Sequence, residues 1–208
     1  MNTAATPARR SARKPKGDGH LRRAEILEAA ERIFVAGGYE GATIRKIADE
    51  VGVSSTALYM HFQDKDGILL EICERTIRQL LVQNTEIASK PLDPATRVKM
   101  ILGAYMRWGL QHPNAYHLVY VAQRQLLWPE GTADLSAQCY DIFAGVVREI
   151  AASGRLRTGT ADSAAQALWM ACHGVVALRI GKPAFAWADS DELIAVVLDG
   201  LLNGLIID

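Results

Sequence analysis

The segment Thr43–Lys65, TIRKIADEVGVSSTALYMHFQDK, decides the fold class. Its pattern predicts two short helices joined by a tight turn, with Thr43 and Ser54 as N-caps. Gly52 fits a turn position that needs a positive φ angle, a conformation that costs other residues energy. The apolar positions that would pack the two helices are Ile47, Ala48, Val53, Leu58 and Phe62. This is the helix-turn-helix pattern, whose second helix enters the major groove of DNA.

The sequence around this segment predicts further helices and no strand of useful length. One helix begins at Leu21 and is stopped by Gly37 and Gly38, and a long helix begins at Asp64 and closes before Pro91. Prolines and glycines then separate further helical segments at about 94–111, 113–127, 132–152, 161–180 and 190–206. The chain is therefore expected to have an all-α fold.

Composition restricts the class of protein. The chain has 208 residues, half of them apolar, which suffices for a sizeable core. No uncharged apolar run approaches the roughly 18 residues that a membrane span needs, so no membrane partner is expected. Cys73, Cys139 and Cys172 are far apart and form no C-x-x-C pair, which argues against a disulfide framework or a zinc site and suits a reducing cytoplasm.

Charge is spread unevenly, although the formal net charge is zero. Residues 1–23 carry seven basic side chains and one acidic side chain, Asp18. A basic start on an otherwise acidic protein indicates an anionic partner, and DNA is the obvious one. A solubilising disordered tail or an organelle transit peptide would share this composition. Residues 1–18 are expected to be disordered.

The stretch from about Arg22 to Leu70 resembles the DNA-binding head of the TetR family. The matching pieces are FVAGGYEGATIRKIA, VGVS and ALYMHFQDKDGIL. The resemblance implies a three-helix head with a helix-turn-helix, joined by a long helix to a helical body. The expected domains are a disordered basic tail at 1–18, a DNA-binding domain at 19–66, and a ligand-binding and dimerisation domain at 67–208.

The resemblance also implies roles for residues of the head on double-stranded operator DNA. Arg45 would reach a guanine, for which a bidentate arginine is the commonest specific partner. Base edges would face Ser54, Ser55, Thr56 and Ala57. Phosphates would be held by Thr43, Lys46, Tyr59, His61 and Lys65. Taken singly, Arg45 and Tyr59 also suit a solvated face, and His61 also suits a helix cap.

The last two predicted helices indicate a second subunit. ALWMACHGVVALRI and LIAVVLDGLLNGLII are apolar on almost every face, and such helices must be covered all round. In the TetR family the corresponding helices form a four-helix dimer interface. The interface candidates are Val175, Val176, Val197, Gly200, Leu201 and Gly204. A helix buried in the core of one subunit is the alternative.

The predicted body is rich in aromatic and methionine side chains with few charges. Such residues usually form a core, but TetR bodies hold a ligand cavity, which implies a mostly apolar small-molecule effector. Trp169, His173 and Gly174 also resemble a spaced Trp–His-Gly feature of one TetR subgroup. The ligand candidates are Tyr105, Trp108, Phe143, Trp169 and His173. A core histidine with satisfied hydrogen bonds is the alternative for His173.

Catalytic patterns are missing from the sequence. The glycines at 37, 38 and 41 lack the G-x-x-x-x-G-K spacing of a phosphate loop, and no G-x-S-x-G occurs. Cys172 and His173 are neighbours, so their side chains would diverge on a helix. No enzyme activity, cofactor or metal is expected. The sequence favours a homodimeric, ligand-released repressor of a palindromic operator, with activation left open. The alternatives are a helical ligand-binding protein or an enzyme without operator function.

Overall fold

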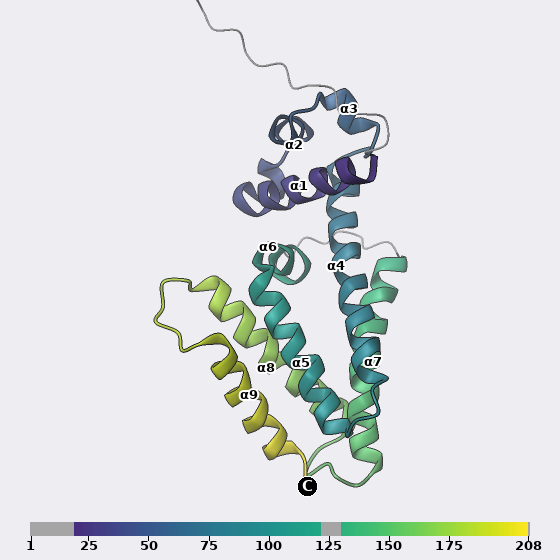
Figure 1. Ribbon diagram of the computed structural model, residues 1–208, viewed down its shortest axis with the longest axis vertical. Helices are drawn as coiled ribbons and strands as arrows, with labels where there is room; N and C mark the ends of the chain where they lie inside the picture. The colour runs from purple at the N-terminus through teal and green to yellow at the C-terminus, as the bar shows by residue number, and fades with distance from the viewer. Residues whose placement is uncertain (1–18, 122–129, 208) are drawn as a thin grey trace, which may run out of the picture. The chain divides into compact units, whose positions relative to one another are not determined.

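A computed structural model describes residues 19–121 and 130–207 of the chain (Figure 1). Every regular element in these ranges is a helix, and the single β-type contact there is an isolated bridge between Leu156 and Ile206. The predicted all-α fold class is confirmed. The tail at 1–18, which the sequence predicts to be disordered, lies outside the described residues. No described helix combines the length and the apolar character needed to cross a membrane.

Contacts divide the chain into two units, Met1–Glu71 and Ile72–Asp208, which we call the head and the body. The described head contains α1 (Gly19–Gly41), α2 (Ile44–Val51), α3 (Ser55–Tyr59) and the first residues of α4 (Lys65–Ala88). Gly38 has φ 65° and interrupts α1, as the sequence predicts, but a helical turn continues to Gly41 instead of ending there. The last part of α4 belongs to the body.

The two short helices of the head have the predicted ends. The Thr43 hydroxyl accepts a hydrogen bond from the Lys46 amide at 3.2 Å, and the Ser54 hydroxyl accepts one from the Ala57 amide at 3.1 Å. Gly52 has φ 70°, in the left-handed region, and ends α2. The predicted helix-turn-helix is therefore present, with α3 as its second helix.

The head is held together by apolar packing and by Arg23. The guanidinium of Arg23 lies 4.2 Å from the centre of the Phe62 ring. It also donates to the His61 carbonyl and to the Glu71 carboxylate, each at 2.7 Å. The sequence grouped Arg23 with the basic N-terminal segment, but these contacts commit its charge to partners within the head. The buried apolar side chains of the head include Ile26, Ala30, Phe34, Ile47, Ala48, Leu58 and Ile68.

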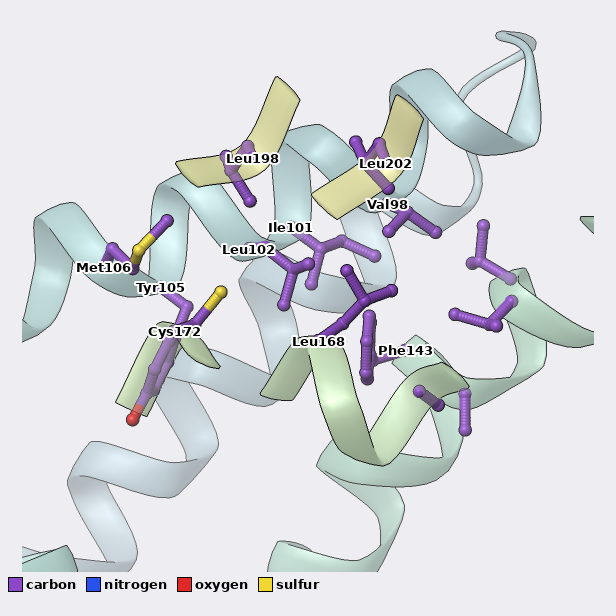
Figure 2. Packing of buried hydrophobic residues seen from close by; sticks show 14 of the residues in the cluster. Val98, Ile101, Leu102, Tyr105, Met106, Phe143, Leu168, Cys172, Leu198 and Leu202 are labelled. Atoms are coloured by element: carbon purple, nitrogen blue, oxygen red, sulfur yellow. The ribbon is translucent and has the colours of Figure 1, made fainter. Parts of the chain in front are cut away.

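The body is built around α5 (Pro94–Gln111), which contacts α7 (Glu130–Ala152), α8 (Ala161–Gly181) and α9 (Ser190–Leu205). Figure 2 shows side chains of α5 meeting those of the other helices in the core. The labelled core residues are Val98, Ile101, Leu102, Tyr105, Met106, Phe143, Leu168, Cys172, Leu198 and Leu202.

The segment after α5 differs from its prediction as one helix over 113–127. A short helix, α6 (Pro113–Tyr116), is followed by a π-helix, η1 (His117–Val121), and residues 122–127 lie outside the described ranges. Pro113 begins α6 because a proline fits the first turn of a helix, where its missing N–H has no partner. Tyr120 lies within this π-helix and lines the cavity described below.

Candidate DNA-binding surface and ligand cavity

Arg45, Thr56 and Tyr59 present the freest polar groups among the candidate DNA contacts. The Arg45 side chain is 87% exposed and lies 3.9 Å from Asp49, a distance at the limit of an ion pair. Thr56 and Tyr59 are exposed on α3, while Ser55 and Ala57 are half-buried on the same helix. Arg45 is on α2, and its long side chain has no packing role in the head. An almost fully exposed guanidinium beside a second helix of short side chains has the chemistry to contact base edges.

Thr43, Ser54 and Lys46 already have partners within the head. The hydroxyls of Thr43 and Ser54 cap α2 and α3, as described above. The Lys46 ammonium donates to the Gly41 carbonyl at 2.7 Å. These side chains shape the helix-turn-helix, and the first amides of α2 and α3 point away from each helix toward solvent or an anion.

Lys65 and His61 lie at the other end of the helix-turn-helix. The Lys65 ammonium donates to the carbonyls of Tyr39 at 2.9 Å and Ala42 at 3.3 Å. An ammonium has three N–H donors, so one donor remains for a phosphate. The His61 carbonyl accepts from Arg23, while its side chain is half-buried. Both residues therefore contribute to the structure of the head.

The body contains a cavity between α4, α5, η1, α7 and α8. About 530 Å³ of free space lies between the lining residues, partly open to solvent, and about 50 Å³ of it is wide enough for the centre of a water molecule. Three predicted ligand residues, Tyr105, Phe143 and Trp169, line this cavity. Trp108 and His173 do not, although both have rings near Tyr105. The cavity is thus narrow and has mainly apolar walls.

His173 lies behind the cavity wall in a cluster of tyrosines. The hydroxyl oxygens of Tyr105 and Tyr116 each lie 3.0 Å from its Nδ1 atom. The Tyr120 and Trp169 rings approach the imidazole edge-on, with centroid distances of 4.7 Å and 5.0 Å. Burial lowers the pKa of His173 to about 4, because a charged imidazolium is poorly solvated there. The imidazole is therefore neutral at pH 7 and positions the tyrosines.

The sequence did not single out Asn84, Tyr120 or Tyr140 as ligand residues, yet all three line the cavity. A signal existed for Tyr140, because it lies on one face of α7 with three other lining residues at helical spacing: Ser136, Cys139 and Phe143. Asn84 gave no such signal, since it is a single amide on a long helix. Its Nδ2 atom donates to the Cys139 carbonyl at 3.3 Å.

An exposed apolar face runs along α8 and α9. It includes Met170, Leu178 and Val196, which are all more than half exposed. The predicted interface residues Gly200 and Gly204 are also exposed, and a Cβ atom at either would meet nothing within 4 Å.

The other predicted interface residues are less exposed. Val175, Val197 and Leu201 are half-buried. Val176 is fully buried, and its Cγ1 atom would lie 2.7 Å from a Cβ atom placed on Gly109. Val176 therefore packs against α5 inside the subunit, and its side chain is not available to a partner. Residues two positions apart on a helix point to different sides. Val176 therefore faces the inside of the subunit, while Leu178 on the same helix faces outward.

Two family models match the chain. Residues 26–72 match the model described as bacterial regulatory proteins, tetR family. Residues 98–201 match the model described as tetracyclin repressor-like, C-terminal domain. Together the matches cover the helix-turn-helix and most of the chain from α5 to α9, but not residues 73–97, where α4 contributes to the cavity.

Curated proteins and solved structures are similar to the chain over different lengths. The transcriptional repressor AcnR of Corynebacterium diphtheriae is 48% identical over 52 residues, which cover 25% of this chain and 27% of AcnR. The transcriptional repressor KstR2 of Mycobacterium tuberculosis is 29% identical over 111 residues, covering 53% and 55%. The chain thus matches from about a quarter to just over half of the length of these relatives. The structure of FadR from Bacillus subtilis in complex with stearoyl-CoA has a TM-score of 0.74 at 20% identity, covering 87% of this chain and 98% of FadR.

Proposed function

The chain belongs to the TetR family of DNA-binding transcriptional regulators, and we propose that it is a repressor released from a palindromic operator by an apolar ligand. The observation that carries this proposal is the presence in one chain of an exposed helix-turn-helix and a narrow apolar cavity. The head supplies DNA binding, and the body supplies ligand binding and dimerisation.

Operator binding would use the exposed surface of α2 and α3. Arg45 has the reach and the free guanidinium for a bidentate bond to guanine. The short side chains of Ser55, Thr56 and Ala57 suit close contact with base edges and thymine methyl groups. Tyr59 and the remaining donor of Lys65 suit phosphates, which set affinity and register without reading sequence.

Dimerisation would cover the apolar face of α8 and α9 with the same face of a second copy. Met170, Leu178 and Val196 leave a large apolar area in water in one subunit. The exposed Gly200 and Gly204 lie one turn apart on α9 and allow another helix to approach closely. A two-fold dimer carries two recognition helices, so its half-sites should lie about 34–36 Å apart, or a multiple of that distance.

Release would follow from ligand binding in the body cavity. FadR of Bacillus subtilis, whose fold is similar, holds stearoyl-CoA, and this supports a small-molecule site in the body of this chain as well. A ligand shifts operator binding only if its affinity differs between the DNA-competent and DNA-incompetent states. A coupling free energy of about 1–3 kcal/mol would change operator affinity about 5–150-fold.

The test has two stages. Genomic DNA fragments that the protein retains are selected and sequenced, and the shared site is inspected for two-fold symmetry. Apolar compounds that raise the melting temperature are then titrated against the protein–operator complex, and transcription from the selected promoter is measured with and without protein. Retention of no specific fragment would favour a helical ligand-binding protein without operator function. Stabilising compounds that leave operator affinity unchanged would refute ligand release.

A further inference from the structure

The described residues that line the body cavity carry no formal charge. Among the described residues that line it, none is an Asp, Glu, Lys, Arg or His, and those with a polar group are Asn84, Ser136, Cys139, Trp169 and three tyrosines. Burial raises the pKa of the Cys139 thiol to about 11, and raises the pKa of Tyr105 and Tyr120 above its usual value of 10. All of these groups are therefore neutral at pH 7, and a charged ligand group would find no counter-charge among the described residues of the wall.

Two tyrosine hydroxyls at the cavity have no hydrogen-bond partner among the described residues. The Tyr140 hydroxyl oxygen is buried with no partner among the described residues. The Tyr120 hydroxyl makes no hydrogen bond to a described residue either, but it is not a buried unpaired atom, so the cost of a missing partner applies to Tyr140. The Tyr105 hydroxyl, in contrast, is already within 3.0 Å of His173 Nδ1. A buried hydroxyl without a partner costs free energy, and a ligand that supplies an acceptor recovers it.

From these observations we propose that the cavity selects an uncharged, narrow, apolar ligand with a carbonyl or similar oxygen, which accepts hydrogen bonds from Tyr120 and Tyr140. The inference rests on the proposed ligand site and adds the chemical class of its ligand. The limited width of the free space suits one aliphatic chain or one flat ring. Carboxylates, phosphates and ammonium groups are disfavoured, because burying a charge without a partner costs far more than burying a neutral carbonyl.

The experiment compares three probes with ten-carbon chains on the full-length protein in the absence of DNA. Isothermal titration calorimetry measures binding of 2-decanone, decanoate and decyltrimethylammonium at pH 7. We expect 2-decanone to bind at least about 10-fold more tightly than either ion, because only the ketone avoids burying a charge. Equal or tighter binding of decanoate would overturn the proposal, and so would the failure of all three probes to bind the folded protein.

Three tyrosine variants test the hydrogen bonds. Tyr120→Phe and Tyr140→Phe should each weaken 2-decanone binding about 2- to 10-fold, the usual range for one hydrogen bond. Tyr116→Phe is the matched control, because its hydroxyl contacts His173 and does not line the cavity. Tyr116→Phe should change the affinity for 2-decanone by less than about 2-fold, which is roughly the effect expected of a substitution away from the binding site. Parental affinity in the Tyr120→Phe/Tyr140→Phe double variant would overturn the hydrogen-bonding part of the proposal.

Melting temperatures show that the variants are folded. Tyr140→Phe should melt at or above the parental temperature, because the hydroxyl that it removes has no partner in the unliganded protein. Failure of this inference can be told apart from failure of the proposed function. If 2-decanone binds as expected but leaves operator affinity unchanged, ligand release fails and the selectivity stands. If decanoate binds more tightly and releases the operator, the selectivity fails and ligand release stands.

Discussion

The ammonium nitrogen of Lys65 lies 3.9 Å from the centre of the Tyr39 ring, while its N–H groups donate to the carbonyls of Tyr39 and Ala42. Lys65 begins α4, whereas Tyr39 lies in the last turn of α1 and Ala42 lies between α1 and α2. Tyr39 also donates from its own hydroxyl to Asp66. The start of α4 is thereby tied to the loop that sets the position of α2 in the head.

Lys65→Ala should both destabilise the head and weaken DNA binding. Loss of two charge-assisted hydrogen bonds at a half-buried site should lower the free energy of unfolding by roughly 1–2 kcal/mol. Loss of a phosphate contact should weaken all DNA sequences similarly and reduce the slope of log affinity against log salt by about one unit. Urea unfolding measures the free energy of unfolding, and fluorescence anisotropy of labelled DNA at several salt concentrations measures the salt dependence of DNA affinity. Both are measured well below the melting temperature, so the two effects can be separated. An unchanged salt slope would restrict Lys65 to a structural role.

Arg45→Ala should remove a sequence-reading contact without disturbing the fold. The side chain is almost fully exposed, and alanine is a good helix former, so stability should be unchanged. Affinity for the selected operator should fall by roughly 1–3 kcal/mol, and the preference at one base pair in each half-site should relax. Arg32→Ala is the matched control, because Arg32 is an exposed head arginine paired with Glu50 and outside the proposed DNA contacts. Parental operator affinity in Arg45→Ala would exclude base reading by this residue.

Val196→Glu should dissociate the dimer and abolish operator binding. Val196 is 64% exposed in one subunit, so the glutamate is tolerated by the subunit, but it would be buried in the proposed interface without a partner. Sedimentation velocity at micromolar concentration should show a dimer for the parent and a monomer for the variant. The half-buried Val197 and Leu201 are less informative positions, because a charge there would also disturb packing inside the subunit.

Val82→Glu is the matched control for Val196→Glu. Val82 is 58% exposed on α4 and lies outside the proposed interface of α8 and α9. The same change of residue there should leave the dimer intact. If Val82→Glu dissociates the dimer and Val196→Glu does not, the interface lies on α4. If both variants remain dimers, an interface centred on Val196 is refuted.

The helix-turn-helix could be predicted in detail because its signals are local. Thr43 and Ser54 are caps, and Gly52 takes a conformation that depends on the residues next to it in sequence. The internal partners of Lys46 and Lys65 could not be predicted, since a lysine in a DNA-binding motif has the same sequence pattern whether its ammonium meets a phosphate or a carbonyl. The carbonyl of Tyr39 reaches Lys65 only through the fold of the head.

The body was less predictable because its cavity depends on contacts between distant helices. Periodicity gave α5, α8 and α9 to within a residue or two, but it did not separate the inner Val176 from the outer Leu178 on an almost wholly apolar helix. The π-helix that contains Tyr120 has no sequence signature of its own. The number of aromatic residues in the body indicated a cavity. The uncharged described lining and the unpaired Tyr140 hydroxyl depend on how the helices pack, and the sequence does not reveal them.

His173 should make the protein less stable as the pH falls from about 6.5 to about 4. Its ordinary pKa of 6.5 applies to the unfolded chain, and burial lowers the folded value to about 4. Between these values the unfolded state binds more protons than the folded state, so the free energy of unfolding decreases with falling pH.

His173→Gln removes this titration and should flatten that decrease, although it lowers stability at every pH because the tyrosine cluster loses its imidazole. Urea unfolding at several pH values between 4 and 7.5 measures the difference in slope. Tyr105→Phe is the control: it removes one hydroxyl beside the imidazole but keeps the titrating group, so the pH slope should persist. If the parent and His173→Gln lose stability in parallel below pH 6.5, the buried imidazole does not contribute to the acid sensitivity of the protein.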